Sequence, residues 1–419
     1  MMKISDIKSE VYTMAEKAME RIKPQFDKID AVAQHNTCKV MAAFQDNRVS
    51  DACFAGTTGY GYDDLGRDVL DKVYAQIFGT EAALVRIGFV NGTHALSAAM
   101  FALVKPGDTI LAATGLPYDT LRSAIGISGD CHGSLKFYGI NYKQVDLDEN
   151  GLPDYEGIKI AAADKNVTAV MIQRSRGYAD RKALTVEEIG KICAVVKEVN
   201  PDANIMVDNC YGEFTGLNEP TNVGADIIAG SLIKNPGGGI APTGGYIAGK
   251  AELVERAAMR LTTPGIGGEC GSTLGNNRLL FQGLFLAPHI VAQALKTAVF
   301  CAAMMEEMGI ESSPGIDEER SDIIQMIKLG SEDNMKKFCL GIQAGAPVDS
   351  YVTPEPWAMP GYDCPVIMAA GAFIQGSSIE LSADGPVREP YIAYMQGGLT
   401  FESGKLGIMM AVSAMLDRH

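Results

Sequence analysis

The chain has 419 residues, of which 47% are hydrophobic and 21% charged, so it has room for about two to three domains and a large core. Its formal net charge of −15 argues against a nucleic-acid-binding protein, because binding to a phosphate backbone requires clustered Lys and Arg. The sequence contains neither a run of about 18 apolar residues nor an apolar core near its start, so we expect a cytoplasmic protein.

Residues 1–50 carry apolar side chains at helical spacing, for example Ile7 and Ala18, and predict an N-terminal helical segment. The following residues, 54–65, are rich in Gly and Tyr and predict an irregular segment, which we call the arm. Farther along, helical and strand patterns alternate. The predicted helices are 70–78, 93–104 and 185–199, and the predicted strands are 82–85, 109–113, 167–173, 204–207, 226–232 and 245–248.

Continuous apolar strands between helices indicate a mostly parallel sheet covered on both faces, the α/β class, with ligand groups at the carboxyl ends of the strands. An Ala- and Met-rich helix at 291–308 precedes a second pattern, which predicts a smaller C-terminal α+β domain. This domain has predicted helices at 321–328 and 333–342, predicted strands at 365–368 and 377–381, and a proline-rich loop at 347–365 with the single tryptophan, Trp357. The expected domains are a helical segment at 1–50, a large domain at 51–290 and a small domain at 291–419.

The cysteines and histidines show no ligand spacing. The nine cysteines form no Cys-x-x-Cys pair, and the five histidines are dispersed. Unpatterned cysteines in a long chain are typical of reduced thiols packed as small apolar side chains, so we expect no disulfide framework and no metal site. The cysteines are Cys38, Cys53, Cys131, Cys193, Cys210, Cys270, Cys301, Cys339 and Cys364.

The most specific feature is Lys234, which follows an apolar strand and precedes a glycine-rich run at 235–239. The predicted strand before that one ends at Asp208. An enzyme that uses pyridoxal phosphate (PLP) needs both groups, because the amine bonds to the cofactor aldehyde and the carboxylate keeps the pyridine nitrogen protonated. Taken alone, Lys234 could be a surface lysine and Asp208 a helix cap. Together they predict a PLP site with Lys234 as its catalytic residue.

Further residues fit the same cofactor. Gly92, Thr93 and His94 open a predicted helix, where backbone amides and the helix dipole can hold a phosphate. Ser231 can reach that phosphate from the lysine side, and Tyr118 can stack on the pyridine ring. An ordinary helix cap and a turn tyrosine would explain these residues one at a time, but their order relative to the lysine favours the cofactor.

With these residues the chain resembles the fold type I PLP enzymes, whose aspartate aminotransferase-like fold has a large and a small domain. More narrowly, it resembles the bacterial methionine gamma-lyase-like or aluminium-resistance family, which is allied to the cystathionine beta-lyases. The resemblance spans residues 10–410. The motifs that carry it are 59–68, 92–95, 117–121, 173–178, 207–214, 230–239 and 378–386.

The resemblance implies a homotetramer, built as a dimer of dimers, with active sites at subunit interfaces. Cystathionine lyases reach the phosphate with a Tyr-x-Arg element of the neighbouring subunit. This chain offers Tyr60, Tyr62 and Arg67 without that spacing, so which of them reaches the phosphate is open. The resemblance also implies an arginine for the substrate carboxylate, for which Arg388 is the main candidate and Arg174 a weaker one.

The predicted activity is β- or γ-elimination from a sulfur-containing L-amino acid of the methionine or cystathionine type. Two alternatives remain. One is a PLP-dependent aminotransferase or another PLP enzyme of amino-acid metabolism, because the choice of reaction depends on how the substrate is oriented. The other is a non-catalytic protein with the PLP fold. Among partners, we expect an amino-acid substrate and further copies of this chain, and neither nucleic acid nor membrane.

Overall fold

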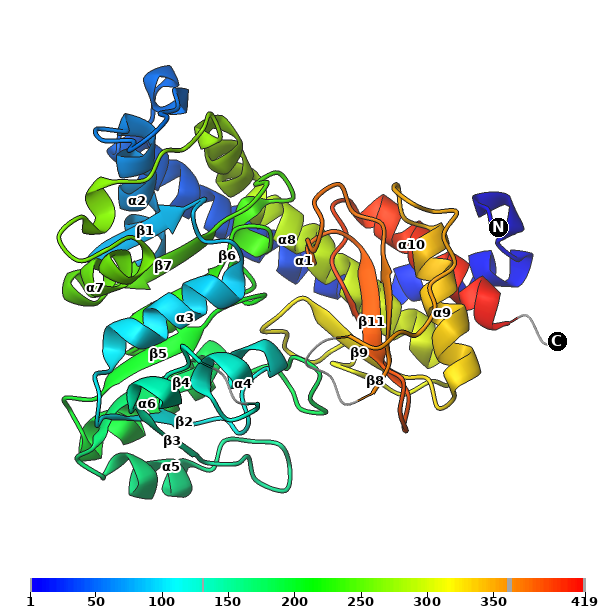
Figure 1. Ribbon diagram of the computed structural model, residues 1–419. Helices are drawn as coiled ribbons and strands as arrows, with labels where there is room; N and C mark the ends of the chain where they lie inside the picture. The colour runs from blue at the N-terminus through cyan, green and yellow to red at the C-terminus, as the bar shows by residue number, and fades with distance from the viewer. Residues whose placement is uncertain (1, 130–131, 360–363, 417–419) are drawn as a thin grey trace. The chain divides into compact units, whose positions relative to one another are not determined.

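The computed structural model describes residues 2–129, 132–359 and 364–416, so Cys131 and residues 360–363 of the proline-rich loop lie outside the described residues. The chain divides into two compact units (Figure 1). One unit is Asn36–Phe285, and the other combines Met1–His35 with Leu286–His419. The expected boundary at 290 lies close to this division. The N-terminal segment, however, is one helix, α1 (Ser9–Asp46), which contributes residues to both units.

The larger unit is built around a mixed seven-stranded sheet in the order β1-β7-β6-β5-β4-β2-β3. The five strands from β6 to β3 are parallel, while β7 and the edge strand β1 run antiparallel to their neighbours. This confirms the mostly parallel sheet. The strands are β1 (Ala82–Arg86), β2 (Thr109–Ala112), β3 (Asn141–Gln144), β4 (Val167–Gln173), β5 (Asn204–Asp208), β6 (Ile227–Ser231) and β7 (Gly245–Gly249).

Helices cover this sheet. One apolar cluster joins α3 and α7 to inward side chains of the strands, including Met206 and Ala229, and Figure 1 shows α3 crossing the sheet. A capping box opens α6, because the Thr185 hydroxyl accepts from the Glu188 amide and the Glu188 carboxylate accepts from the Thr185 amide. The helices of this unit are α2 (Leu65–Phe78), α3 (Gly92–Leu103), α4 (Asp119–Ile125), α5 (Tyr155–Ala162), α6 (Val186–Val199) and α7 (Ala251–Leu261).

The second unit contains an antiparallel five-stranded sheet in the order β10-β11-β12-β9-β8. One cluster joins the start of α1, the long helix α8 (Asn277–Glu307), α9 (Glu332–Ala344) and α10 (Phe401–Met415) to this sheet. By length and composition α8 could cross a membrane, but 67% of its apolar stretch is buried, as in a core helix. The strands are β8 (Ser312–Ser313), β9 (Ile324–Lys328), β10 (Val366–Ala370), β11 (Ser382–Pro386) and β12 (Ile392–Gln396).

Two predictions for this unit were wrong. The predicted helix 321–328 contains strand β9, whose apolar run is too short for its periodicity to distinguish a buried strand from a helix. The predicted strand 377–381 lies just before β11, which has the sequence Ser-Ala-Asp-Gly-Pro. That sequence is poor in strand-forming residues, and its pairing with β10 and β12 overrides its intrinsic preference.

Candidate active site

Three segments that are distant in the sequence meet at the carboxyl ends of β5 and β6. A Cβ atom added to Gly92 at the start of α3 would lie 3.0 Å from the Cβ of Ser231 and 3.7 Å from the Sγ of Cys210. Ser231 ends β6, and Cys210 comes two residues after Asp208, which ends β5. We call Gly92, Asp208, Ser231 and Lys234 the strand-end site. The structure therefore groups the predicted cofactor residues where parallel strands end.

Lys234 stands three residues after β6, in front of a tight turn. Its Nζ lies 3.8 Å from the ring centroid of Tyr211. The turn requires glycine at position 237, because a Cβ there would lie 1.7 Å from the carbonyl oxygen of Leu232. Burial alone would lower the pKa of Lys234, but nearby groups on the 208–211 segment outweigh it, so the pKa lies above its usual value.

Asp208 is buried at the end of β5, and one carboxylate oxygen accepts from the amide of Cys210 at 3.1 Å. Burial raises the pKa of the Asp208 carboxyl, and the charge of Lys234 opposes that rise. A buried carboxylate with a raised pKa is a strong acceptor for a cationic N–H group. Asp208 is thus suited to stabilise a protonated ring nitrogen.

The start of α3 has the features of an anion site. Asn91 caps the helix by accepting from the amide of His94 at 2.9 Å, while amides in the first helical turn have no acceptor within the helix. The Oγ of Ser231 is buried and has no hydrogen-bond partner among the described residues. Thr93 adds a hydroxyl that lies 3.0 Å from the hydroxyl of Thr120. These groups fit a phosphate.

His94 has a different role in this arrangement. Its Nδ1 accepts from the backbone amide of Val90 at 3.3 Å, so the side chain holds the turn that leads into α3. Burial and the charge of Arg260 lower its pKa, which favours the neutral imidazole. His94 therefore supports the anion site through its backbone rather than as a cation.

The described residues fit a PLP group by three independent observations. The buried Ser231 hydroxyl lacks a partner, the glycine at position 92 keeps its surroundings open, and an amine and a buried carboxylate stand at neighbouring strand ends. The Ser231 hydroxyl and Gly92 match the phosphate of the cofactor, the amine matches its aldehyde, and the carboxylate matches its ring nitrogen.

Tyr118 lies beside this site, at the start of α4. Its backbone amide donates to the side chain of Gln173 at 2.8 Å, and Gln173 in turn donates to the carbonyl of Ser175 at 3.0 Å. A Cβ on Gly177 would lie 3.1 Å from the Tyr118 ring, so the ring packs against the segment after β4. Its stacking on a cofactor ring remains a prediction.

Arg174 belongs to a buried polar network. Its guanidinium, only 1% exposed, donates to Asn209 at 2.7 Å and to Thr215 at 3.1 Å, and it pairs with Glu219 at 3.4 Å. These contacts hold the segment that follows Asp208. They give Arg174 a structural role, while its contact with substrate remains a prediction.

Glu213 is fully buried in the same region. One of its carboxyl oxygens accepts from the Tyr246 hydroxyl at 2.8 Å, and the other has no hydrogen-bond partner among the described residues. Burial raises the pKa of Glu213 to about 8, with a smaller contribution from Glu219. Glu213 therefore carries a proton near neutral pH.

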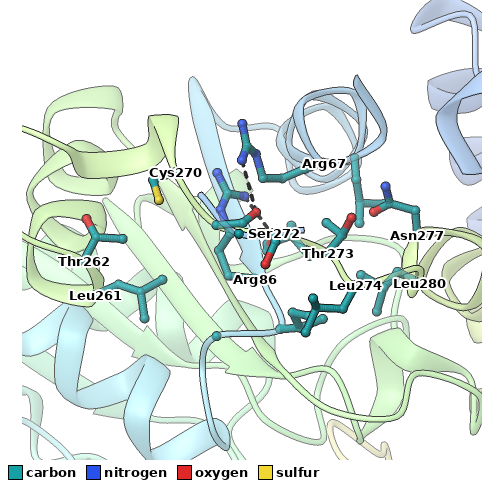
Figure 2. Close-up of a pocket in the computed structure, with 16 residues that line it drawn as sticks. Arg67, Arg86, Leu261, Thr262, Cys270, Ser272, Thr273, Leu274, Asn277 and Leu280 are labelled. Carbon is teal, nitrogen blue, oxygen red and sulfur yellow. Dashed lines mark hydrogen bonds between the residues drawn. The ribbon is translucent and has the colours of Figure 1, made fainter. Parts of the chain in front are cut away.

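The arm presents its two tyrosines to solvent. Tyr60 and Tyr62 are 68% and 55% exposed, and their rings stack on each other at 5.6 Å. Arg67, which is buried, donates to the carbonyls of Gly61 and Gly271 and so fixes the arm to a neighbouring loop. A pocket of about 390 Å³ lies between these segments. Figure 2 shows the Arg67 side chain among the residues that line it.

Arg388 lies in the other unit, in the turn after β11. Its side chain is exposed, its amide donates to the carbonyl of Pro386 at 2.9 Å, and its own carbonyl accepts from Tyr391 at 2.7 Å. The turn is therefore well defined by the backbone. The role of Arg388 in binding a substrate carboxylate remains a prediction.

Sequence reasoning missed Tyr211. Its backbone adopts a left-handed conformation, with φ of 72°, which is uncommon for a residue with a large side chain. Asn235, next to the lysine, donates to the carbonyls of Tyr211 and Glu213 and so holds this conformation. The available signal was an aromatic residue three positions after Asp208, which does not reveal its contact with the lysine.

Comparisons with known proteins agree over nearly the whole chain. A family model described as methionine gamma-lyase matches residues 11–416. A carbon-sulfur lyase involved in aluminium resistance, from Clostridium novyi NT, is 56% identical with a TM-score of 0.94, covering 97% of this chain and 96% of that one. The uncharacterized protein YnbB of Bacillus subtilis is 48% identical over 392 residues, 93% of each chain. The PLP-dependent protein YhfS of Escherichia coli shares the fold at 17% identity, with a TM-score of 0.61 over 90% of this chain and 94% of that one.

Proposed function

The chain belongs to the methionine gamma-lyase family, and we propose that it is a PLP-dependent carbon–sulfur lyase acting on a sulfur-containing L-amino acid. The reaction is β- or γ-elimination from a substrate of the methionine or cystathionine type. The observation that carries the proposal is the convergence of the Lys234 amine, the Asp208 carboxylate and the amino end of α3. The activity in the name of the Clostridium novyi relative supports the same reaction class.

Each residue of the strand-end site then has a defined role. Bound PLP supplies an electron sink for the bond that breaks at the substrate Cα. Asp208 accepts a hydrogen bond from the ring nitrogen and stabilises its positive charge. The amides of Gly92 and Thr93, with the Ser231 hydroxyl, hold the phosphate.

Lys234 anchors the cofactor and moves the proton at Cα. Its amine, when neutral, would accept that proton. The Tyr211 ring, 3.8 Å from Nζ, restricts where this amine can lie. Arg388 is proposed to bind the substrate carboxylate with its guanidinium fork.

The exposed tyrosines of the arm support a proposal about assembly. We infer that the protein forms a homotetramer, built as a dimer of dimers, in which Tyr60 or Tyr62 reaches the phosphate of a neighbouring subunit. Arg67 already binds carbonyls within its own chain, which leaves the two tyrosines as the better candidates. We also propose that the enzyme acts in the cytoplasm.

The proposal is tested by the visible absorption of the purified protein, before and after adding L-methionine, L-cystathionine or L-cysteine. We expect a yellow protein that releases a keto acid, ammonia and a thiol from one of them. Lys234→Ala should lose both the covalently held cofactor and turnover. Turnover retained in Lys234→Ala would refute the site, and keto acid without ammonia would favour transamination. A colourless protein that PLP cannot reconstitute would refute the cofactor.

A further inference from the structure

The segment after β4 forms a closed loop beside the strand-end site. The amide of Leu184 donates to the carbonyl of Arg174 at 2.9 Å, so residues 174–184 leave β4 and return to it. The last residue of β4, Gln173, lies opposite Asp208 in the register of the parallel sheet. Whatever fixes the end of β4 therefore also fixes the surroundings of Asp208.

Arg181 is the side chain that fixes it. Its guanidinium is only 8% exposed and donates to the carbonyl of Gln173 at 2.9 Å and to that of Ser175 at 2.6 Å. A third bond, of 2.9 Å, goes to the carbonyl of Lys182. Burying a cation is costly unless carbonyl dipoles or an anion compensate its charge. The three carbonyls provide the local compensation, and a nearby anion would provide the electrostatic compensation.

The electrostatic explanation is Asp208. The charged and titratable groups that act on its carboxyl are Lys234, Arg181 and Cys210. Arg181 stabilises the anionic form of Asp208, as Lys234 does in the free chain. However, Lys234 is the residue expected to bond to the cofactor, and its amine then no longer acts as a free cation. Of these three groups, Arg181 is the cation whose charge stays fixed whether or not cofactor is bound.

We propose that Arg181 is a positioning residue of the cofactor site, which holds the end of β4 opposite Asp208 and favours the anionic form of that carboxylate. This inference rests on the proposed function, because it concerns how Asp208 meets the ring nitrogen of PLP. The bonds from Arg181 to the end of β4 have a second effect. Gln173, whose carbonyl Arg181 binds, also receives the amide of Tyr118, so the end of β4 connects Asp208 to the candidate stacking residue.

The test is the dissociation constant of PLP, measured at pH 6 and pH 8 for the wild type, Arg181→Gln and Arg181→Lys. If Arg181→Gln raises the pKa of Asp208, PLP affinity should fall more at pH 6 than at pH 8, because neutral Asp208 cannot stabilise the pyridinium. Each unit by which the pKa rises can weaken binding by at most about tenfold. Arg181→Lys keeps the charge but loses the fork, so it should weaken binding to the same extent at both pH values. Lys182→Gln removes an equal charge from an exposed neighbouring position and should bind as the wild type does.

The outcomes separate the inference from the function on which it rests. Equal weakening at both pH values in Arg181→Gln, or the same pH-dependent loss in Lys182→Gln, would overturn the role of Arg181. If thermal melting shows that Arg181→Gln does not fold, a pH-dependent loss in Arg181→Lys would overturn it instead, and a pH-independent loss would support it. A wild-type protein that binds no PLP at either pH would overturn the proposed function itself.

Discussion

The strand-end site and the arm are built in opposite ways. Asp208 and Ser231 are buried at strand ends, and Lys234 lies against Tyr211 of the same chain. Tyr60 and Tyr62 are instead exposed, and their rings stack on each other. The difference indicates that the chain carries both the lysine and the ring partner of the proposed site, while its exposed arm is suited to a role outside that site.

The largest effect should come from the crowded junction within the strand-end site. In Gly92→Ala, the new methyl would lie 3.0 Å from the Cβ of Ser231, a close contact within the anion site. Overpacking of this kind costs about 1–3 kcal/mol, and if the PLP complex bears this cost the PLP dissociation constant should rise about fivefold to 160-fold. Gly88→Ala is the matched control, because a Cβ there meets no atom within 4 Å. Equal PLP affinities for the two variants would contradict the proposal that the anion site holds the phosphate.

A second prediction concerns the buried acid next to the strand-end site. The pKa of Glu213 is raised to about 8 from an ordinary value of 4.5, so the folded chain binds a proton that the unfolded chain releases in this range. The stability from this proton is complete below pH 4.5 and is lost as the pH rises to about 8, with a slope of up to about 1.4 kcal/mol per pH unit.

Glu213→Gln should therefore flatten the dependence of unfolding free energy on pH between pH 5 and pH 8. Denaturant unfolding at several pH values measures this slope. Glu255→Gln changes an exposed glutamate and should leave the slope as it is. An unchanged slope in Glu213→Gln would mean that Glu213 is ionised in the folded protein.

The smallest effects should come from the arm. Replacing Tyr60 or Tyr62 by Phe removes one hydroxyl hydrogen bond, worth about 0.5–1.5 kcal/mol, so PLP affinity should fall about twofold to tenfold. The loss should occur only at protein concentrations at which subunits associate. Tyr351→Phe, at a tyrosine that is 69% exposed, is the control. The variant with the larger loss identifies the tyrosine that reaches the phosphate, and losses in neither variant would contradict the proposed role of the arm.

The sequence was a good guide where local chemistry and tertiary structure agree. Asp208 was predicted to end a strand and does so, and the helix predicted at 185–199 is present as α6. Residues 382–386, in contrast, form β11 although they include Asp, Gly and Pro, because strands pair with them on both sides. Partners that lie far away in the sequence decided that outcome, and no local pattern reports them.

The candidate site shows the same limit. The positions of Gly92, Asp208 and Lys234 could be predicted because the ends of parallel strands share one edge of the sheet. The left-handed backbone of Tyr211 and the carbonyl contacts of Arg181 could not, because they depend on loop geometry. Motifs name the residues that meet the ligand, whereas the side chains that hold them in place have no comparable spacing.

The division of α1 between the two units has a consequence for biosynthesis. Near its start, Val11 and Ile22 pack in one cluster with Ala298 and later residues of α8, α9 and α10. The ribosome adds 276 residues after Ile22 to reach Ala298 (298 − 22), which takes roughly 15–60 s at about 5–20 residues per second. During that time the apolar stripe of α1 has no native partner. A newly made chain therefore exposes an amphipathic helix from early in translation until α8 emerges, and this is the stage at which a chaperone would have the most to protect.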